Sequence, residues 1–301
     1  MSKVIGVLCG GPSRERDISI RSGQAVYEAL RSLGLPVSLV VLSEQIEQIP
    51  EEIRQLGLHT AFIALHGRYG EDGTVQALLE QMKIPYTGSS SEACRYAMDK
   101  VHSRRRWAAA GIPVPEWKLT DPLSAAAHAE KMKFPLVVKP VSEGSSIGIS
   151  IIDSIDQLSE AVALAAPGGG SILLEEYLPG PELTVGMLDN QPLPVIQLVP
   201  KRRFYDFVAK YTPGMTDYLV PAPLPEPVAH QVQEIARRAH EALGCRSFSR
   251  VDFILAEGRG PVVLELNAIP GMTASSLLPK AAALTGVSFP ELCRRMLESA
   301  Y

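Results

Sequence analysis

The sequence predicts a mixed α/β and α+β fold built from three units, and three observations support this prediction. Strand and helix signals alternate over residues 1–88, this alternation stops at Ser89, and a strongly apolar hairpin pattern fills residues 249–267. Alternating strands and helices form a parallel sheet with helices on its faces, whereas consecutive strands pair antiparallel. We therefore expect an N-terminal α/β domain (1–88), a central α+β domain (89–181) and a C-terminal α+β domain (182–301).

Composition indicates a packed protein rather than a nucleic-acid or membrane protein. The 301 residues are 46% hydrophobic and 21% charged, and the formal net charge is −4 without a basic stripe. The densest basic cluster, Arg104 to Arg106, is interpreted as a solvated helix face. No segment approaches the roughly 20 apolar residues that cross a bilayer, and the four cysteines lack a CxxC pair. We expect a cytoplasmic protein without nucleic-acid or membrane partners.

The first domain opens with a short strand, VIGVLCGG, that ends in glycines. Helical spacing in SIRSGQAVYEALRSLG comes next, and then the strands PVSLVVL and TAFIALHG, the helix TVQALLEQMK and the strand IPYTG. Ligands of parallel sheets bind at the carboxyl ends of the strands. Residues 9–15 and 66–73 occupy two such ends.

The central domain reads as one helix followed by antiparallel strands. The helix runs through SEACRYAMDKVHSRRRWAAAG, and the strands are FPLVVKP, GISIID and SILLEEYL, with a helix around residues 155–165. The proline and glycine in LPGPE mark the exit of this domain near Gly180.

The C-terminal domain begins with a predicted hairpin, ELTVGMLDNQPLPVIQLVP. The polar aromatic stretch that follows, KRRFYDFVAKYTPGMTDYL, has no clear period. A long irregular segment in a compact domain is typical of a functional loop such as an active-site lid, so we expect a lid over residues 201–219. A helix over residues 228–243 and two strands complete the domain.

These last two strands, in SRVDFILAEGRGPVVLELNAIPG, bring carboxylates together. A symmetric hairpin pairs three apolar couples, namely Val251 with Leu266, Phe253 with Leu264, and Leu255 with Val262. The other face then holds Asp252 opposite Glu265, and Arg250 opposite Asn267. Facing carboxylates repel each other unless a cation lies between them, and such oxygen ligands favour Mg²⁺ or Mn²⁺. The alternative is that Arg250 neutralises both acids in a solvated network.

Lys139 ends an apolar strand, and a buried ammonium needs an anionic partner. The following loop, EGSSIG, could bring backbone amides and hydroxyls close to an anion such as phosphate. It is not a P-loop, because the lysine precedes it, and LCGGPSRER does not match the dinucleotide motif GxGxxG. The alternative is a strand-end lysine whose ammonium extends into solvent.

Eight motifs follow one another along the chain: GGPSRERDISIRSG, HGRYGEDGT, YTGSSSEACRYAMDK, FPLVVKPVSEGSSIG, LLEEYLPGPELTV, FYDFVAKYT, SRVDF and LELNAIPGMTASSLLP. With these motifs in this order, the chain resembles the D-alanine–D-alanine ligases of the ATP-grasp superfamily over essentially its whole length. The resemblance implies an ATP-grasp fold, in which a parallel-sheet domain precedes two α+β domains that sandwich ATP. It also implies that the anion beside Lys139 is the phosphate chain of ATP.

For the nucleotide, the resemblance implies that Lys100 and Lys139 bind the α and β phosphates and that Lys210 meets the γ-phosphate. The covering loop would supply Glu143, Gly144, Ser145 and Ser146. The adenine contacts would be Glu175 and the backbone from Glu176 to Leu178, with Glu182 on the ribose. The ligands of two Mg²⁺ or Mn²⁺ ions would be Asp252, Glu265 and Asn267.

For the amino-acid substrates, the resemblance implies a second group of residues. Glu15 would anchor the ammonium of the first D-alanine and be linked through Ser145 to Tyr211 on the closed lid, with His66 nearby. Ser276 and the Leu277 amide would hold the carboxylate of the second D-alanine. Arg250 and the Gly271 amide would stabilise an oxyanion.

The implied reaction joins two D-alanine molecules through a D-alanyl phosphate, with release of ADP and phosphate, for peptidoglycan precursors. A homodimer is expected, as is usual in the family. The nearest alternatives are relatives that take D-lactate or D-serine as second substrate, but Glu15, Lys210 and Tyr211 favour dipeptide formation. A non-catalytic ATP sensor is disfavoured, because it would need neither Arg250 nor the Ser276 carboxylate site.

Overall fold

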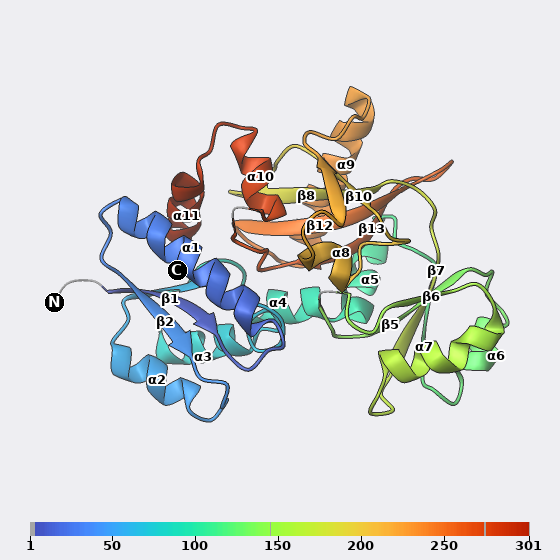
Figure 1. Cartoon of the computed structure of the whole chain (residues 1–301), viewed down its shortest axis with the longest axis horizontal. Helices are drawn as coiled ribbons and strands as arrows, with labels where there is room; N and C mark the ends of the chain where they lie inside the picture. The colour runs from blue at the N-terminus through green and yellow to red at the C-terminus, as the bar shows by residue number, and fades with distance from the viewer. Residues whose placement is uncertain (1–3, 145, 274, 301) are drawn as a thin grey trace.

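The computed structural model describes residues 4–144, 146–273 and 275–300, and three β-sheets form its framework (Figure 1). The N-terminal sheet lies at one end of the molecule, the central sheet at the other, and the C-terminal sheet between them. The predicted combination of one α/β and two α+β units is confirmed.

The N-terminal sheet is parallel, as predicted, with strand order β2-β1-β3. Its domain contains β1 (Ile5–Gly10), α1 (Arg16–Ser32), β2 (Val37–Leu42), α2 (Ile49–Leu56), β3 (Thr60–Ile63) and α3 (Thr74–Met82). Helices cover both faces, since Val7 packs in the core with α1 and Leu8 packs in the core with α2 and α3. The predicted strand IPYTG is wrong. One bridge, between Ala61 and Tyr86, forms there. Pro85 has no amide hydrogen to extend the ladder on one side, and on the other side the Ile63 amide donates to the Thr87 hydroxyl oxygen and not to a backbone carbonyl.

The central sheet is antiparallel, with strand order β4-β7-β5-β6. The elements of this region are α4 (Ser91–Met98), α5 (Lys100–Ala109), β4 (Trp117–Thr120), α6 (Ala125–Ala129), β5 (Leu136–Pro140), β6 (Ser150–Ile152), the 3₁₀ turn η1 (Ile155–Gln157), α7 (Leu158–Ala165) and β7 (Ile172–Glu176). The single predicted helix over residues 91–111 is wrong. Asp99 is extended, and its carboxylate accepts hydrogen bonds from the amides of Val101 and His102, so it ends α4 and caps α5.

The C-terminal sheet has the strand order β11-β10-β8-β12-β13, with β9 paired to β8. Its elements are β8 (Glu182–Leu188), β9 (Gln191–Pro192), β10 (Ile196–Pro200), α8 (Phe207–Tyr211), β11 (Thr216–Leu219), α9 (Glu226–Ala242), β12 (Phe248–Ala256), β13 (Gly260–Asn267), α10 (Leu277–Ala283) and α11 (Phe289–Glu298). The lid over residues 201–219 is more regular than predicted. It contains α8, which Asp206 caps through the Ala209 amide, and β11, which pairs with β10.

The β12–β13 hairpin has the predicted register only at its polar end. Asp252 lies opposite Glu265 and Arg250 opposite Asn267, but the register shifts after Asp252, so that Phe253 faces Val263. The predicted pairs of Phe253 with Leu264 and of Leu255 with Val262 are therefore wrong. This β-bulge is held from outside the hairpin, because the Val263 amide donates to the Pro113 carbonyl 2.9 Å away.

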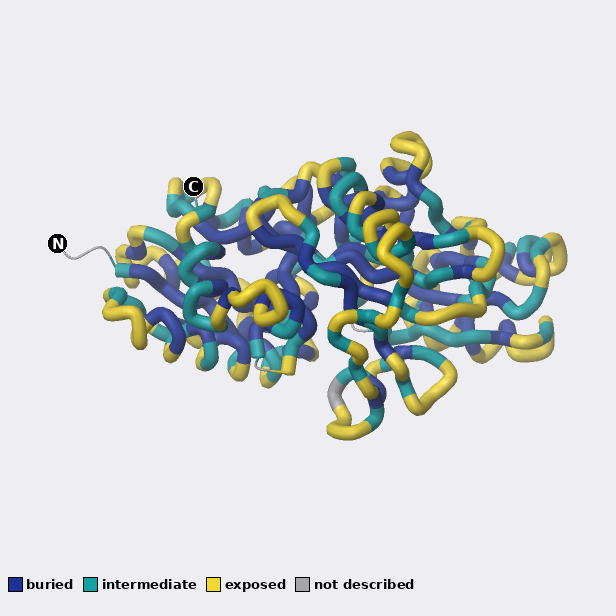
Figure 2. The backbone as a smooth tube through the Cα atoms, turned by 90° about the horizontal axis from the view of Figure 1, so that it is seen from above, coloured by how far each residue is buried: buried dark blue, intermediate teal, exposed yellow. Residues whose placement is uncertain are grey.

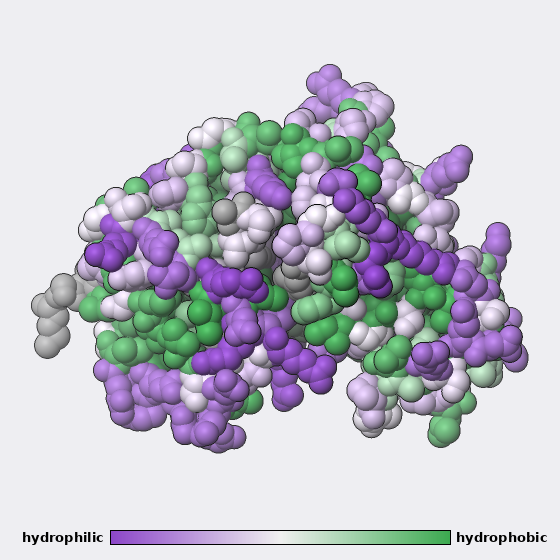
Figure 3. Space-filling model, in the orientation of Figure 1, coloured by the Kyte–Doolittle hydropathy of each residue, from purple (hydrophilic) through white to green (hydrophobic). Residues whose placement is uncertain are grey.

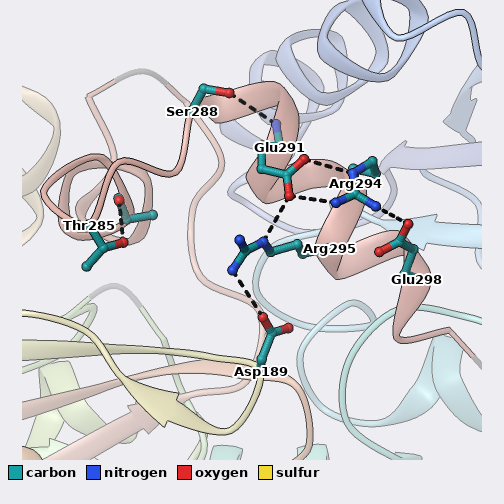
Figure 4. Close-up of polar contacts among 8 residues, drawn as sticks. Asp189, Thr285, Ser288, Glu291, Arg294, Arg295 and Glu298 are labelled. Carbon is teal, nitrogen blue, oxygen red and sulfur yellow. Dashed lines mark hydrogen bonds and ion pairs between the residues drawn. The ribbon is translucent and has the colours of Figure 1, made fainter.

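Buried backbone runs through all three domains, and exposed loops surround it (Figure 2). Helix α11 packs its apolar face on the core that contains α1, while its polar face carries exposed ion pairs. In that network Glu291 binds Arg294 and Arg295, and Arg295 lies 3.5 Å from Asp189 beside β8 (Figure 4). No helix among the described residues is both long and apolar enough to span a membrane.

Candidate functional site

A cavity of about 530 Å³ lies between the lid, the polar end of the hairpin and the N-terminal domain. Eight of the residues predicted to act line it, namely Glu15, His66, Lys210, Arg250, Asn267, Gly271, Ser276 and Leu277. These residues come from five separate segments of the chain. Hydrophilic side chains gather around the hollow between the two ends of the molecule on the face shown in Figure 3.

A second, small cavity of about 20 Å³ is lined by five of the residues predicted to act, one of which is Asn267. Its walls include Lys100, Glu143, Gly144 and Glu265. Asn267 lines both cavities, so the two lie side by side. The structure thus brings the predicted phosphate-binding loop next to the predicted amino-acid cleft.

Asp252 is held by three neighbours at the polar end of the hairpin. Arg250 binds both of its carboxylate oxygens at 2.8 Å, and the Thr184 hydroxyl donates to Oδ1 at 2.6 Å. Asn267 Nδ2 lies 3.3 Å from Oδ2. Arg250 thus neutralises one of the two acids, in a pair whose side chains are 13% and 11% exposed, so the solvated network of the alternative does not form around Asp252.

Glu265 is surrounded by cations from two domains. Burial opposes its ionisation, but the charges of Lys210, Lys100, Lys139 and Arg250 more than offset this and hold the pKa of Glu265 at about 2. Lys210 Nζ lies 4.0 Å from the carboxylate. Glu265 is therefore a carboxylate throughout the physiological pH range and can bind a cation.

The anion beside Lys139 is Glu175. The Lys139 ammonium contacts Oε2 of Glu175, and the other oxygen, Oε1, accepts a 2.9 Å hydrogen bond from Arg104 Nε. Lys139 is 6% exposed, which rules out an ammonium that extends into solvent. Burial lowers the pKa of Lys139 although Glu175 opposes this shift.

Arg104 corrects the interpretation of Arg104 to Arg106 as a solvated helix face. Arg105 and Arg106 are exposed, but the Arg104 side chain is completely buried against β7. The sequence did contain a signal for this. Arg104 follows Lys100 by four residues, and side chains at that spacing share one face of a helix.

Lys100 fastens the loop that follows β5. Its ammonium donates to the Glu143 carbonyl at 2.6 Å, and its amide donates to the Val141 carbonyl at 3.0 Å. Burial lowers the pKa of Lys100 to about 8. The ammonium therefore points at the same loop that the motif EGSSIG predicts to cover an anion.

Glu15 and His66 lie together at the carboxyl ends of the N-terminal strands. Glu15 is buried, and a Cβ atom on Gly67 would lie 2.7 Å from its Oε2, so only glycine fits at this position, where φ is +69°. His66 contacts Ser22 Oγ at 2.9 Å and Glu71 Oε1 at 3.4 Å through its two ring nitrogens.

Two predicted members of the substrate group are not tested by the structure. Ser145 lies outside the described residues, and Tyr211 is placed only as the last residue of α8. The predicted link from Glu15 through Ser145 to Tyr211 stays a prediction. Ser146 is described, and its hydroxyl donates to the Tyr205 carbonyl of the lid at 3.0 Å.

Ser276 and Gly271 face each other across a tight turn before α10. The Thr273 amide donates to Ser276 Oγ at 3.0 Å, and a Cβ atom on Gly271 would lie 2.9 Å from the same oxygen. Ser276 also precedes the first residue of α10, Leu277. Gly271, Ser276 and Leu277, from this turn and the start of α10, line the large cavity.

The predicted adenine and ribose residues line neither of these two cavities. Glu175 is buried in its ion pairs, and Glu176 accepts from the Glu116 amide and contacts Arg259. Leu178 follows β7, and burial raises the pKa of Glu182, at the start of β8, to about 7. Their roles stay predictions.

The sequence reasoning missed several side chains of the large cavity, notably Tyr205, Tyr218 and Glu71. The hydroxyls of Tyr205 and Tyr218 lie 3.1 Å apart, and Lys210 Nζ lies 5.2 Å from the Tyr205 ring. The aromatic content of the lid was noted in the sequence, but nothing in its spacing showed which rings face the cavity.

Two family models match the chain, one described as "D-ala D-ala ligase C-terminus" over residues 107–298 and one as "D-ala D-ala ligase N-terminus" over residues 41–89. The D-alanine–D-alanine ligase of Syntrophotalea carbinolica is 46% identical over 99% of this chain and 96% of its own length. That of Desulforudis audaxviator is 44% identical over 100% of this chain and 99% of its own.

Solved structures of ligases are similar to this chain in fold over almost its whole length. A D-alanine–D-alanine ligase from Bacillus anthracis complexed with ATP is 32% identical, with a TM-score of 0.86 over 99% of this chain and 97% of that one. A D-Ala:D-Ser ligase from Enterococcus faecalis is 26% identical, with a TM-score of 0.86 over 99% of both chains.

Proposed function

Because the chain belongs to the D-alanine–D-alanine ligase family, we propose that the two adjoining cavities carry out that family's reaction with the residues described above. The enzyme uses ATP to join two D-alanine molecules into D-alanyl-D-alanine for peptidoglycan synthesis. The assignment of roles to individual residues is supported chiefly by one observation. Cationic groups suited to phosphate and polar groups suited to an amino acid meet where Asn267 lines both cavities.

The first step activates a carboxylate. Glu15 and His66 hold the first D-alanine in the large cavity, and its carboxylate attacks the γ-phosphate, so that D-alanyl phosphate forms and ADP leaves. The ammonium groups of Lys100, Lys139 and Lys210 stabilise the negative charge of the phosphates. Lys210 lies on α8 of the lid, so that closure of the lid completes this set.

The second step forms the peptide bond. The amine of the second D-alanine attacks the acyl carbon, and phosphate leaves with the bonding electron pair. Ser276 and the Leu277 amide hold the carboxylate of this substrate. Arg250, fixed in place by Asp252, and the Gly271 amide stabilise the oxyanion of the tetrahedral intermediate. The closed lid protects the acyl phosphate from water.

Divalent metal is expected with ATP, and the donor set fits Mg²⁺ or Mn²⁺. Glu265 is ionised, and Asp252 and Asn267 add hard oxygen atoms, although Asp252 would share its carboxylate with Arg250. Among the described residues there is no cluster of three or more histidine, cysteine or carboxylate side chains that would suggest another metal. Two bound ions would neutralise phosphate charge.

Phosphate release in the presence of ATP, Mg²⁺ and D-alanine tests this function. We expect turnover that requires D-alanine and yields the dipeptide. Binding of ATP without D-alanine-dependent turnover would instead identify a non-catalytic nucleotide sensor.

The second substrate is a separate question, since one structural neighbour is named a D-Ala:D-Ser ligase. D-alanine, D-serine and D-lactate compared as acceptors at neutral and alkaline pH would answer it. We expect D-alanine to give the fastest product formation. Faster formation of the ester with D-lactate would overturn the choice of acceptor but not of reaction class.

We also propose that the enzyme acts in the cytoplasm as a homodimer, as the resemblance to its family implies. Sedimentation equilibrium over a range of protein concentrations tests the dimer. A single species with the 32.5 kDa mass of one chain would contradict it.

A further inference from the structure

In a buried ion cluster between α5, β5 and β7, two cations directly contact one carboxylate, and the more distant charge of Glu265 also acts on the lysine. Its members are Arg104, Lys139 and Glu175, whose side chains are 0%, 8% and 2% exposed. A buried charge without a partner is unfavourable, so a surplus of positive charge at this depth needs an explanation.

The two cations divide Glu175 between them. Arg104 binds Oε1 through Nε at 2.9 Å, and its Nη2 lies 2.8 Å from the same oxygen without hydrogen-bond geometry. Lys139 contacts only the other oxygen, Oε2. Each cation therefore has a separate half of the carboxylate.

Arg104 has little else to bind. Among the described residues its Nη1 has no hydrogen-bond partner, and Glu175 is its only ionic partner. The guanidinium carbon lies 5.7 Å from the centre of the Trp107 ring, and Trp107 is itself fixed by a 3.0 Å hydrogen bond to the Ala239 carbonyl. The side chain is thus held against one carboxylate.

The chemistry of the two cations explains this division. Arginine stays charged under all physiological conditions and holds a carboxylate in a fixed geometry, whereas lysine is a point charge on a flexible stem. If Lys139 alone neutralised Glu175, an incoming phosphate would have to break a closed buried pair and leave the carboxylate uncompensated. With Arg104 present, Glu175 keeps a counter-charge when Lys139 turns to another anion.

We propose that Arg104 is a positioning residue of the nucleotide site, which holds Glu175 so that Lys139 stays available to a phosphate group of ATP. This inference rests on the proposed function. A merely structural role, in which the ion pair joins α5 to β7, would lower stability without a selective effect on nucleotide.

Calorimetric titration with a non-hydrolysable ATP analogue and Mg²⁺ tests the proposal directly. We expect Arg104→Met to weaken binding about 10- to 100-fold, since it removes a charged hydrogen bond from Glu175. Arg104→Lys keeps the charge but loses the fixed geometry of the guanidinium, so it should weaken binding less than Arg104→Met does. Arg105→Met, at the exposed neighbouring position on the same helix, is the matched control and should bind normally. Normal binding by Arg104→Met would overturn the proposal.

A double-mutant cycle shows whether Arg104 acts through Glu175. In a Glu175→Gln background the carboxylate is absent, so we expect Arg104→Met to change analogue binding by less than about 3-fold. An equal loss in both backgrounds would mean that Arg104 acts by another route.

Steady-state kinetics and thermal melting complete the test. The KM for ATP should rise in Arg104→Met, while the KM for D-alanine stays within about 2-fold. Equal changes in both would indicate a structural role. If Arg104→Met does not fold, Arg104→Gln is compared with Arg104→Lys, and equal analogue binding by these two would overturn the role of the charge.

The same measurements separate this inference from the proposed function. Absence of D-alanine-dependent turnover in both the unmodified chain and Arg105→Met would refute the function itself. Normal turnover in both, together with normal analogue binding by Arg104→Met, would refute only the role of Arg104.

Discussion

The N-terminal domain and the central sheet are attached to the C-terminal domain in different ways. Side chains of β1 and α1 share one continuous apolar core with α10 and α11. The central sheet instead closes a core of its own within residues 125–174. Its contacts with the lid and hairpin are polar, and they include the ion pairs of Arg203 with Asp153 and of Arg259 with Glu176 and the hydrogen bond from Ser146 to the Tyr205 carbonyl.

This difference indicates which side of the site can open. Separating two domains that share an apolar core exposes that whole core to water, which costs much free energy. Exposed ion pairs contribute little free energy to holding two domains together, and salt screens them. The N-terminal wall of the amino-acid cleft is therefore fixed to the C-terminal domain by apolar packing. The central sheet, on the nucleotide side, contacts the lid and hairpin through polar groups. The predictions below test this comparison, from the largest expected effect to the smallest.

Removal of the Glu265 charge should reduce turnover more than any other change. Glu265 lines the small cavity, which adjoins the amino-acid cleft, and its carboxylate lies 4.0 Å from Lys210 of the lid. We expect Glu265→Gln to lower kcat by at least about 100-fold, through loss of a group that faces metal and phosphate, while the protein stays folded. Glu257→Gln, in the exposed hairpin turn, is the control. Turnover equal to that of the control would remove Glu265 from the site.

Lys139→Ala tests the nucleotide side alone. We expect the KM for ATP to rise about 10- to 100-fold, while the KM for D-alanine changes little, because Lys139 lies on the central sheet and not in the amino-acid cleft. Lys133→Ala, at an exposed position before the same strand, serves as control. A loss confined to D-alanine affinity would contradict the placement.

His240 should make the free energy of unfolding depend on pH. It is buried between Ser249 and Asn190, and burial lowers its pKa from 6.5 to about 4. The unfolded chain therefore binds a proton at higher pH than the folded one, so stability is complete above pH 6.5 and falls as pH drops towards 4. From about pH 7 to 5 this amounts to about 2 kcal/mol.

Urea unfolding at several pH values measures this contribution. The free energy of unfolding of His240→Gln should depend less on pH than that of the unmodified chain over the same interval. Parallel curves for the two proteins would show that His240 does not titrate in this way.

The smallest effect is expected at the ion pair between lid and central sheet. Arg203 binds both oxygens of Asp153, at 2.7 and 2.6 Å, and both side chains are well exposed. Arg203→Ala should raise the KM for ATP about 2- to 5-fold and should have no further effect in Asp153→Ala. An Arg203→Ala effect that persists in high salt would show that the contact is more than ionic.

Sequence reasoning recovered the chemistry of the hairpin but not its full geometry. Asp252, Glu265, Arg250 and Asn267 lie opposite each other as predicted, because alternation of side chains fixes the face of a strand. The bulge after Asp252 could not be predicted, since beside it the Val263 amide donates to the carbonyl of Pro113, far away in the chain. Similarly, the composition of residues 201–219 predicted a lid. Its helix α8 and strand β11 were not predicted, because β11 forms by pairing with β10 and such pairing is not visible in the sequence of the lid itself.

The sequence by itself determined the order of the three units, the acidic pair of the last hairpin and the family, because periodicity and motifs are properties of neighbouring residues. Only the tertiary structure decided that Glu175 is the partner of Lys139 and that Arg104 is buried beside it. Arg104 and Glu175 stand 71 positions apart. The charge of a helix residue does not reveal which surface will cover it, since burial is settled by packing between elements.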